Sequence, residues 1–287
     1  KIPFAKIRKL LLQGKSEFEL PNGEIAVIPD SWFVNYSEIF AFLEDNENAE
    51  EKTLMLKKHH IALAQELQNN NLVQLTMSRK LEKLRDFSQI EEYELPETFK
   101  GTLRPYQKAG YNWLRFLNDY RFGGCLADDM GLGKTVQTLA LLAHEKKVSE
   151  GATSLLVMPT SLIYNWELEA KKFTPGLKVL TYTGTQRIKD NTRFANYDLV
   201  LTSYGIIRLD LDLLKTFYFN YIILDESQAI KNPASKVTKA ASLLKAKHRL
   251  CMSGTPLQNN TFDIFAQMNF LNPGLLGSME FFRNEFA

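Results

Sequence analysis

The sequence predicts an α/β fold with a parallel sheet flanked by helices over residues 97–287, preceded by a small α+β domain over residues 1–96. From about residue 97, short apolar runs alternate with stretches of helical periodicity. These runs are continuously apolar, as in strands that helices cover on both faces. The predicted strands lie near Gly124–Leu126, Leu155–Met158, Lys178–Tyr182, Leu199–Thr202, Tyr221–Leu224 and Arg249–Met252. Ligands of such sheets bind at the carboxyl ends of the strands.

The first 96 residues show a different pattern, which predicts a hairpin followed by helices. Apolar and polar residues alternate in 17–20 and 24–28, and Pro-Asn-Gly at 21–23 predicts the turn between them. Ser31 is placed to cap a helix with one apolar face, and the acidic stretch 44–52 predicts a loop. Two further helical patterns lie near 57–68 and 78–87. Adjacent histidines, His59 and His60, are interpreted as surface or packing residues.

Composition places the chain among ordinary globular proteins. Of its 287 residues, 45% are hydrophobic and 24% are charged, which excludes a disordered or collagen-like chain. Its apolar runs fall far short of the roughly 18 residues that span a bilayer, so we expect no membrane partner. Residues 1–96 hold 12 Lys and Arg against 16 Asp and Glu, whereas residues 97–287 hold 23 against 17. The basic excess of the second part suits an anionic partner.

Two features bear on the setting of the chain. Cys125 and Cys251 lie in short apolar runs and are predicted to be buried strand residues, not a disulfide framework or a zinc site. We therefore expect a reducing, cytoplasmic location. The first residues lack the shape of a signal peptide, and both ends of the sequence suggest a piece of a longer chain.

A glycine-rich segment, Ala127-Asp-Asp-Met-Gly-Leu-Gly-Lys-Thr135, lies between a predicted strand and a predicted helix. Gly131 and Gly133 let the backbone wrap closely around phosphates, so that amide groups point inward. The helix that starts here adds a partial positive charge at its N-terminus. Lys134 supplies a charge for the β- and γ-phosphates, and Thr135 supplies a hydroxyl for Mg²⁺. The segment predicts a site for a nucleoside triphosphate.

A second motif, Tyr221-Ile-Ile-Leu-Asp-Glu-Ser-Gln228, brings two acids to the end of a buried strand. Asp225 can hold Mg²⁺, directly or through water. Glu226 can polarise the water that attacks the γ-phosphate. Combined with the phosphate loop about ninety residues upstream, this pair predicts nucleotide hydrolysis.

Six segments in order resemble the first RecA-like lobe of the Swi/Snf-type ATPases of helicase superfamily two. The segments are Leu-Arg-Pro-Tyr-Gln at 103–107, Asp-Asp-Met-Gly-Leu-Gly-Lys-Thr at 128–135, Val-Met-Pro-Thr-Ser-Leu-Ile-Tyr-Asn-Trp at 157–166, Leu-Thr-Ser-Tyr-Gly at 201–205, Leu-Asp-Glu-Ser-Gln-Ala-Ile-Lys-Asn at 224–232 and Ser-Gly-Thr-Pro-Leu-Gln-Asn at 253–259. They span about 160 residues. The resemblance is greatest to bacterial members, some of which carry an accessory domain before the ATPase.

The resemblance implies roles for the matching residues. ATP would be bound by Gln107, Asp129, Met130, Gly131, Leu132, Gly133, Lys134 and Thr135, with Gln107 reading the adenine edge. Thr135 and Asp225 would bind Mg²⁺, and the catalytic residues would be Lys134, Asp225 and Glu226. Coupling of the nucleotide state to the DNA-facing side would fall to Gln228, Ser253, Gly254 and Thr255. The segments that grip the DNA backbone would contribute Pro159, Thr160, Ser161, Thr202 and Ser203, contacts that carry little sequence information.

The resemblance also implies a function, an ATPase that depends on double-stranded DNA and remodels protein–DNA complexes. In this family a second lobe supplies an arginine finger, so we expect the 287 residues alone to lack turnover. The alternative is a protein-interaction module with a non-hydrolysing nucleotide-binding lobe, in which residues 1–96 recruit a protein partner. A P-loop kinase fits less well, because kinases lack the segments at 103–107 and 253–256.

A few positions depart from the usual pattern. Asp128 stands where the common phosphate loop has its first glycine, and Asp129 stands where the family commonly has Glu. Ser227 replaces a small Ala or Gly, and Gln228 in place of His argues against an RNA helicase. A basic cluster follows, made of Lys236, Lys239, Lys245, Lys247, His248 and Arg249. It is interpreted as a solvated helix face, with nucleic-acid contact as the alternative.

Overall fold

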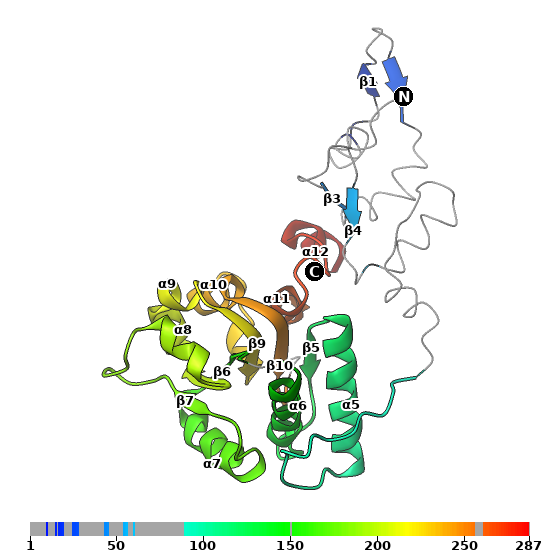
Figure 1. The fold of residues 1–287 in the computed structure, drawn as a ribbon. Coiled ribbons are helices and arrows are strands. Elements are labelled where there is room, and N and C mark those ends of the chain that lie inside the picture. Colours follow the sequence, from blue (N-terminus) through cyan, green and yellow to red (C-terminus); the bar gives the residue numbers. More distant parts are fainter. Residues whose placement is uncertain are drawn as a thin grey trace. The chain divides into compact units, whose positions relative to one another are not determined.

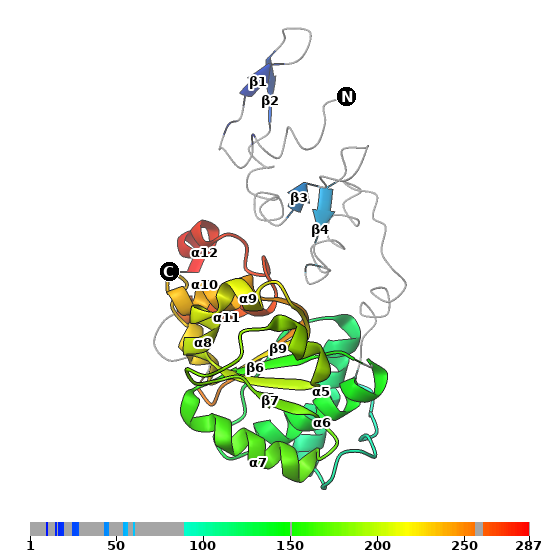
Figure 2. The same cartoon turned by 60° about the vertical axis from the view of Figure 1, so that its left-hand side comes forward.

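The computed structural model describes residues 89–149, 151–255 and 261–286, together with short stretches among the first 60 residues. It divides into two compact units, one of residues 88–273 and one of residues 1–87 with 274–287. Each unit is described by itself below. Figures 1 and 2 show the chain from two sides.

The larger unit is built on a six-stranded sheet in which every neighbouring pair is parallel. The strands are β5 (Gly124–Leu126), β6 (Ser154–Met158), β7 (Val179–Thr181), β8 (Leu199–Ser203), β9 (Tyr218–Asp225) and β10 (Lys245–Met252). Their order across the sheet is β5-β10-β9-β6-β8-β7. The six predicted strands are confirmed, but β9 and β10 begin earlier than predicted. Their first residues pair in register as Lys245 with Tyr218, and this pairing extends beyond the apolar run.

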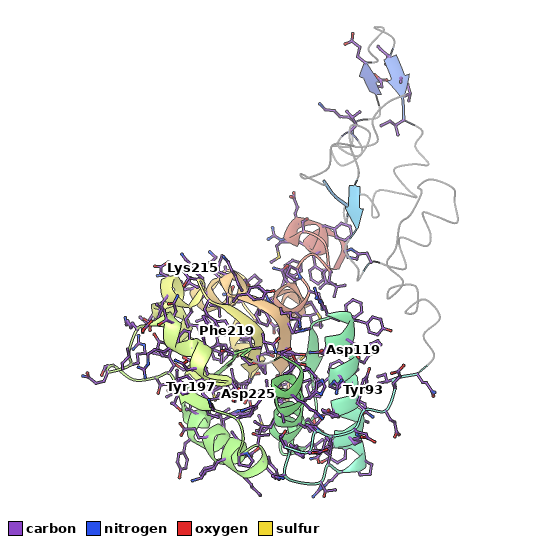
Figure 3. All side chains as sticks on the ribbon, in the orientation of Figure 1. Tyr93, Asp119, Tyr197, Lys215, Phe219 and Asp225 are labelled. Atoms are coloured by element: carbon purple, nitrogen blue, oxygen red, sulfur yellow. The ribbon has the colours of Figure 1, made fainter. Side chains whose placement is uncertain are left out.

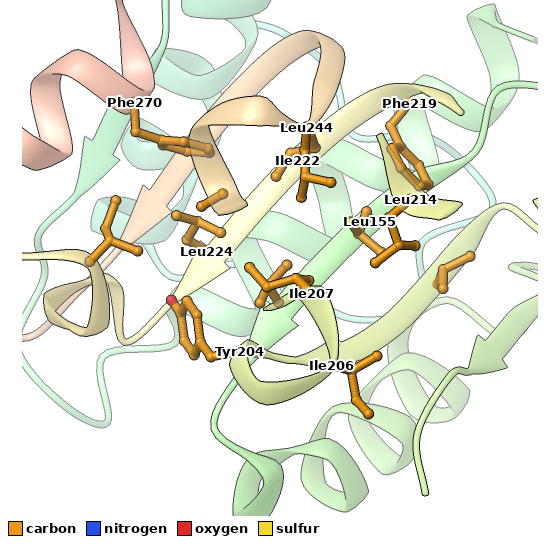
Figure 4. Packing of buried hydrophobic residues seen from close by; sticks show 14 of the residues in the cluster. Leu155, Tyr204, Ile206, Ile207, Leu214, Phe219, Ile222, Leu224, Leu244 and Phe270 are labelled. Atoms are coloured by element: carbon orange, nitrogen blue, oxygen red, sulfur yellow. The ribbon is translucent and has the colours of Figure 1, made fainter. Parts of the chain in front are cut away.

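Helices cover both faces of this sheet, and alternate residues of a strand face opposite helix layers. In β6, Leu155 and Val157 pack in one apolar cluster, whereas Leu156 and Met158 pack in the other. The layer on the Leu156 side consists of α5 (Pro105–Tyr120), α6 (Lys134–Val148) and α7 (Ile163–Phe173). The layer on the Leu155 side consists of α8 (Tyr204–Leu209), α9 (Leu211–Leu214), α10 (Lys236–Leu243) and α11 (Thr261–Leu271). Figure 4 shows this second cluster, where Ile207 and Leu214 lie close to strand residues such as Ile222. The fold is the predicted RecA-like α/β architecture.

The helix α5 begins where the sequence provides the signals for a start. Pro105 occupies the first turn, where its missing N–H costs nothing. Gln107 closes a capping box by accepting from the backbone N–H of Arg104 at 2.9 Å. The helix ends at Arg121, whose φ of 56° is left-handed.

The larger unit begins before residue 97, at residue 88. The hydroxyl of Tyr93 donates to Asp119 Oδ2 at 2.8 Å (Figure 3). Arg115 lies over the Tyr93 ring at 4.5 Å. The side chain of Lys108 donates to the carbonyl oxygen of Tyr93. The extent of the accessory domain, 1–96, stays a prediction.

In the smaller unit the predicted hairpin is present as antiparallel β1 (Glu17–Glu19) and β2 (Ile25–Val27). The prediction of a loop over 44–52 is wrong at its start. Glu44 and Asp45 belong to β3 (Leu43–Asp45), which pairs with β4 (Leu54–Leu56). Local charge had suggested a loop, but strand pairing satisfies the backbone there. The unit also contains α12 (Met279–Phe286).

Several predictions for this unit fall outside the described residues. They are the helices after Ser31 and near 57–68 and 78–87, as well as His59. His60 is buried, and its Nε2 lies 3.1 Å from the carbonyl oxygen of Leu275 in the same unit.

The two cysteines are neighbours in the sheet, where Cys251 of β10 pairs in register with Cys125 of β5. Cys251 is buried, Cys125 is half-buried, and both are free thiols. Burial raises the pKa of the Cys125 thiol to about 11. The prediction that both cysteines are strand residues is confirmed, whereas the prediction that both are buried is confirmed for Cys251 alone. Among the described residues, no helix is long and apolar enough to cross a membrane.

Candidate nucleotide-binding site

The sheet brings the sequence motifs together at one edge. Register pairs Leu126 with Met252 and Met252 with Asp225, so three neighbouring strands end side by side. The glycine-rich loop follows β5, the segment 253–255 follows β10, and Glu226 follows β9. The glycine-rich loop lies about ninety residues before Glu226 and about 120 residues before the segment 253–255. The parallel order of β5, β10 and β9 makes these motifs adjacent.

The glycine-rich loop wraps around its own lysine. Gly131 and Gly133 have φ of 82° and 84°, the left-handed region that glycine adopts without strain. Lys134 Nζ donates to the carbonyl oxygens of Asp128 at 2.7 Å and Asp129 at 3.1 Å. Gly133 is also the N-cap of α6, so the helix N-terminus opens onto the same loop. The loop therefore has the cation, the exposed amides and the helix end that a phosphate requires.

Two glycines, Gly133 and Gly254, lie in close contact with other residues of the site. A Cβ on Gly133 would lie 2.4 Å from Gln107 Nε2. A Cβ on Gly254 would lie 3.1 Å from Met130 Cγ and 3.9 Å from Lys134 Nζ. The predicted coupling residue Gly254 thus lies against the phosphate loop.

Gln107 joins α5 to the loop. Its Nε2 donates to the carbonyl oxygen of Leu132 at 3.0 Å, while its Oε1 accepts from the N–H of Arg104. The structure therefore brings Gln107 to the glycine-rich loop, and its reading of adenine stays a prediction.

Gln137 of α6 supports the glycine-rich loop, and the sequence analysis did not identify it. Its Nε2 donates to Asp128 Oδ2 at 2.9 Å, at the position where the common phosphate loop has glycine. The side chain is fully buried. The signal available in the sequence was its place one turn after the loop lysine in α6.

Asp225 lies at the end of β9 with 8% of its surface exposed. Its Oδ2 accepts from the indole N–H of Trp166 at 2.8 Å, and its Oδ1 accepts from the N–H of Glu226 at 2.9 Å. Burial raises the pKa of the carboxyl group, and the hydrogen bonds from Trp166 and Glu226 and the nearby charge of Lys134 oppose that rise. The backbone oxygen of Asp225 accepts from Tyr204 Oη at 2.8 Å. The sequence analysis gave neither Trp166 nor Tyr204 a role in the site.

Glu226 begins a chain of hydrogen bonds that ends in the segment 253–255. The backbone of Glu226 is left-handed, with φ of 50°, and this turns it out of the strand. Gln228 Nε2 donates to Glu226 Oε2 at 2.7 Å, and Ser253 Oγ donates to Gln228 Oε1 at 2.9 Å. The N–H of Thr255 donates to Ser253 Oγ at 3.1 Å. The structure thus joins Glu226, the predicted water-activating acid, to three of the four predicted coupling residues, Gln228, Ser253 and Thr255.

A buried hydrogen bond joins Ser227, which lies between Glu226 and Gln228, to α11. Ser227 Oγ donates to Gln267 Oε1 at 2.8 Å, and both side chains are buried. Ser227 therefore does more than preserve a small side chain at this position.

The predicted DNA contacts differ in accessibility. Thr160 and Ser161 are exposed after β6, in the 3-10 helix η2 (Thr160–Leu162), and Pro159 caps that helix half-buried. Thr202 is fully buried and its Oγ1 donates to the carbonyl oxygen of Tyr182 at 2.9 Å. Ser203 is buried and its hydroxyl caps α8. The hydroxyls of Thr202 and Ser203 are thus engaged inside the fold, and DNA contact by any of the five stays a prediction.

The basic cluster is not one surface. Lys236, Lys239, Lys245 and Lys247 are exposed, as expected for a solvated face. His248 is buried and stacks on Tyr221, with ring centroids 4.8 Å apart. Arg249 donates to the carbonyl oxygens of Phe270, Ser242 and Leu244. The last two residues of the cluster were wrongly assigned to it, because they belong to the interior of β10.

The residues fit ATP and Mg²⁺. Mg²⁺ typically takes one or two carboxylates together with phosphate oxygens and waters, and the described residues contain no cluster of three or more His, Cys, Asp or Glu side chains that would suggest another type of metal site. Asp225 and Thr135 would bind the ion, while Lys134 and the loop amides would hold the phosphates. Bound there, Mg²⁺ would neutralise charge on the β- and γ-phosphates.

The fold and this site define a P-loop nucleotide-binding domain with paired acids. Residues 106–287 match the family described as SNF2-related domain, which is more than half of the chain. The chain belongs to this family.

Two relatives show how the similarity is distributed. The chain is 42% identical over 216 residues to the TATA-binding protein-associated factor mot1 of Aspergillus fumigatus, covering 70% of this chain and 11% of that protein. It is 41% identical over 223 residues to YwqA of Bacillus subtilis, covering 75% of this chain and 24% of that protein. The chain thus spans less than a quarter of the length of these relatives. The prediction of a bacterial member is not supported, because fungal, plant and human proteins match as well.

A solved structure agrees with the fold. The Sulfolobus solfataricus SWI2/SNF2 ATPase core in complex with dsDNA is 44% identical in sequence and has a TM-score of 0.63. The match covers 70% of this chain and 41% of that one.

Proposed function

We propose that this chain is the ATP-binding lobe of an ATPase that depends on double-stranded DNA and remodels protein–DNA complexes. The observation that carries the proposal is the hydrogen-bonded chain from Glu226 through Gln228 to Ser253 beside the glycine-rich loop. A nucleotide-dependent change at Glu226 has a direct route to the segment 253–255, as a motor requires.

In this proposal each side chain has one task at the nucleotide. Lys134 and the amides of the loop bind the phosphates, and Gln107 contacts the adenine edge. Asp225 and Thr135 hold Mg²⁺. Glu226 orients the attacking water and accepts its proton.

Three observations support DNA as the second ligand. Residues 97–287 carry the basic excess of the chain. Thr160 and Ser161 expose hydroxyls at the carboxyl end of β6, where ligands of parallel sheets bind. The similar Sulfolobus core was solved in complex with dsDNA.

ATP turnover by the full-length protein, measured with duplex DNA, single-stranded DNA and RNA, tests the proposal. We expect stimulation by duplex DNA above the other two. If duplex DNA does not stimulate turnover, the proposal fails. Nucleotide binding without turnover under all three conditions would favour the alternative, a protein-interaction module in which residues 1–96 recruit a partner.

We further propose that residues 1–287 alone bind Mg-ATP weakly and hydrolyse it negligibly. In the family that the chain resembles, an arginine finger comes from a second lobe, and such a finger contributes roughly 10³–10⁵ in rate. Single-turnover hydrolysis by the 287-residue chain, compared with the full-length protein, measures this difference. Equal rates would contradict it.

A further inference from the structure

The carboxylate of Asp225 is held by a side chain from a different element of the fold. The indole N–H of Trp166, on α7, donates to Asp225 Oδ2 over 2.8 Å. Trp166 is 1% exposed and is one of the largest fully buried side chains. Water therefore does not compete for this bond, and an unmade bond at this depth would leave a buried donor unsatisfied.

The position of Trp166 is itself fixed by packing. It lies among apolar residues of the cluster that includes Ile163, Ala170 and Met158. An indole fixed in this way has little rotational freedom, so its N–H defines one direction for the carboxylate. The other oxygen, Oδ1, accepts from the N–H of Glu226, so both oxygens are oriented by the protein.

We infer that Trp166 is a positioning residue that presents the Asp225 carboxylate to the Mg²⁺ of the nucleotide complex. The inference rests on the proposed ATP site. Side chains that hydrogen-bond to a metal ligand fix its orientation, and losing them typically weakens metal affinity 10- to 100-fold.

The inference also implies that α7 contributes to the site, because it carries Trp166. The 3-10 helix with Thr160 and Ser161 leads directly into α7, and Trp166 lies on the first turn of that helix. The segment after β6 is thereby connected to the metal-binding acid by a rigid element that spans only a few residues.

Nucleotide binding by the 287-residue chain, measured with a fluorescent ATP analogue over a Mg²⁺ titration and again in EDTA, tests the inference. In Trp166→Phe, we expect the Mg²⁺ concentration required for half-maximal binding to rise roughly 10-fold or more. Affinity in EDTA should stay within about twofold, since the phosphates still meet Lys134 and the loop. Trp113→Phe is the matched control, because Trp113 packs on the same apolar cluster and should leave the Mg²⁺ dependence unchanged.

A second replacement separates the hydrogen bond from the packing. Replacing Trp166 with 3-benzothienylalanine keeps the bicyclic shape and removes only the N–H donor. We expect the same rise in the Mg²⁺ requirement, with the thermal midpoint within a few degrees of that of the natural chain. An unchanged Mg²⁺ requirement in this variant would overturn the inference.

An NMR spectrum of the chain labelled with ¹⁵N at the indole nitrogens gives a readout independent of affinity. The sequence has three tryptophans, and the signal of Trp166 is identified by its loss in Trp166→Phe. Mg²⁺ with nucleotide should shift this signal, whereas the Trp113 signal should move less. A Trp166 signal that does not respond while binding occurs would overturn the positioning role alone. If the natural chain binds no nucleotide, the proposed function fails as well.

Discussion

Two buried aspartates of this fold, Asp210 and Asp225, accept hydrogen bonds from different kinds of donor. Arg187 holds Asp210 with two hydrogen bonds, from Nε at 2.5 Å and Nη2 at 2.8 Å, and Lys189 Nζ lies 3.0 Å away. Tyr182 Oη donates to the same carboxylate at 2.8 Å. The hydrogen bonds of Arg187 hold the pKa of Asp210 well below its usual range.

Asp225 instead accepts from the neutral indole of Trp166 and from the backbone N–H of Glu226. Burial raises its pKa. The difference indicates that a buried acid whose cations come from the fold is structural, whereas a buried acid held by neutral donors beside a phosphate loop can take its cation from a ligand. The predictions below test this contrast, from the largest expected effect to the smallest.

The largest effect is expected for Lys134→Ala. The loop loses the ammonium group that meets the phosphates, so Mg-nucleotide binding should disappear in calorimetry. The free energy of unfolding should change by less than about 0.5 kcal/mol, as for a partly exposed residue. Lys147→Ala, on the exposed far end of the same helix, is the control and should bind as the natural chain does. Unchanged binding in Lys134→Ala would refute the phosphate-loop assignment.

Asp210→Asn should destabilise the fold far more than Asp225→Asn. Removing the charge of Asp210 leaves Arg187 buried without its partner, which costs about 3 kcal/mol. Asp225→Asn removes a charge that burial disfavours, but it turns an amide NH2 toward one of the two N–H donors of the carboxylate, so the free energy of unfolding should fall by less than about 1.5 kcal/mol. Urea denaturation of both variants measures the difference. A similar loss of unfolding free energy in the two variants would contradict the distinction between a structural Asp210 and a ligand-binding Asp225.

The two acids should also give stability opposite dependences on pH. The folded pKa of Asp210 lies below its unfolded value of about 3.9, so its contribution is present above that pH and is lost as the pH falls. The folded pKa of Asp225 is raised, so its contribution is present below about pH 3.9 and is lost as the pH rises through the folded pKa. Urea denaturation from pH 3 to 7 measures both. Asp210→Asn should weaken the loss on acidification, and Asp225→Asn should weaken the loss on raising the pH.

The smallest effect is expected for Ser253→Ala. It removes two neutral hydrogen bonds, the one that the hydroxyl donates to Gln228 and the one that it accepts from the N–H of Thr255. The bond from Thr255 is worth about 1 kcal/mol, or roughly fivefold in an equilibrium. Nucleotide affinity should stay within about threefold, while the amide of Thr255 should exchange with solvent roughly fivefold faster. Hydrogen exchange read by NMR measures this change, and an unaltered Thr255 rate would remove Ser253 from the coupling chain.

Local sequence was sufficient for the strands and the phosphate loop. The six strands followed from continuous apolar runs, because a strand buried on both faces needs apolar residues at successive positions. The loop followed from Gly131, Gly133 and Lys134, because left-handed backbone and a cation at a helix start are properties of neighbouring residues. The acids Asp225 and Glu226 were likewise identifiable at the end of an apolar run.

The same local reasoning failed where partners lie far apart in the chain. Trp166 was given no role in the site, yet its indole N–H donates to an acid 59 residues away. Arg249 was grouped with surface lysines, yet it satisfies the carbonyl oxygens of Phe270, Ser242 and Leu244. The hydroxyl of Thr202 donates to the carbonyl oxygen of Tyr182, a contact that the sequence did not indicate.

By itself, the sequence therefore determined which chemical groups this protein carries and on which strands and loops they lie. Only the tertiary structure decided which of them meet. Covalent neighbours and backbone geometry set local structure, whereas the strand order β5-β10-β9-β6-β8-β7 decides which loops share an edge and which polar groups are buried together. The hydrogen bond between Trp166 and Asp225 depends on that order, because it joins helix α7 to a strand that lies two crossovers further along the chain.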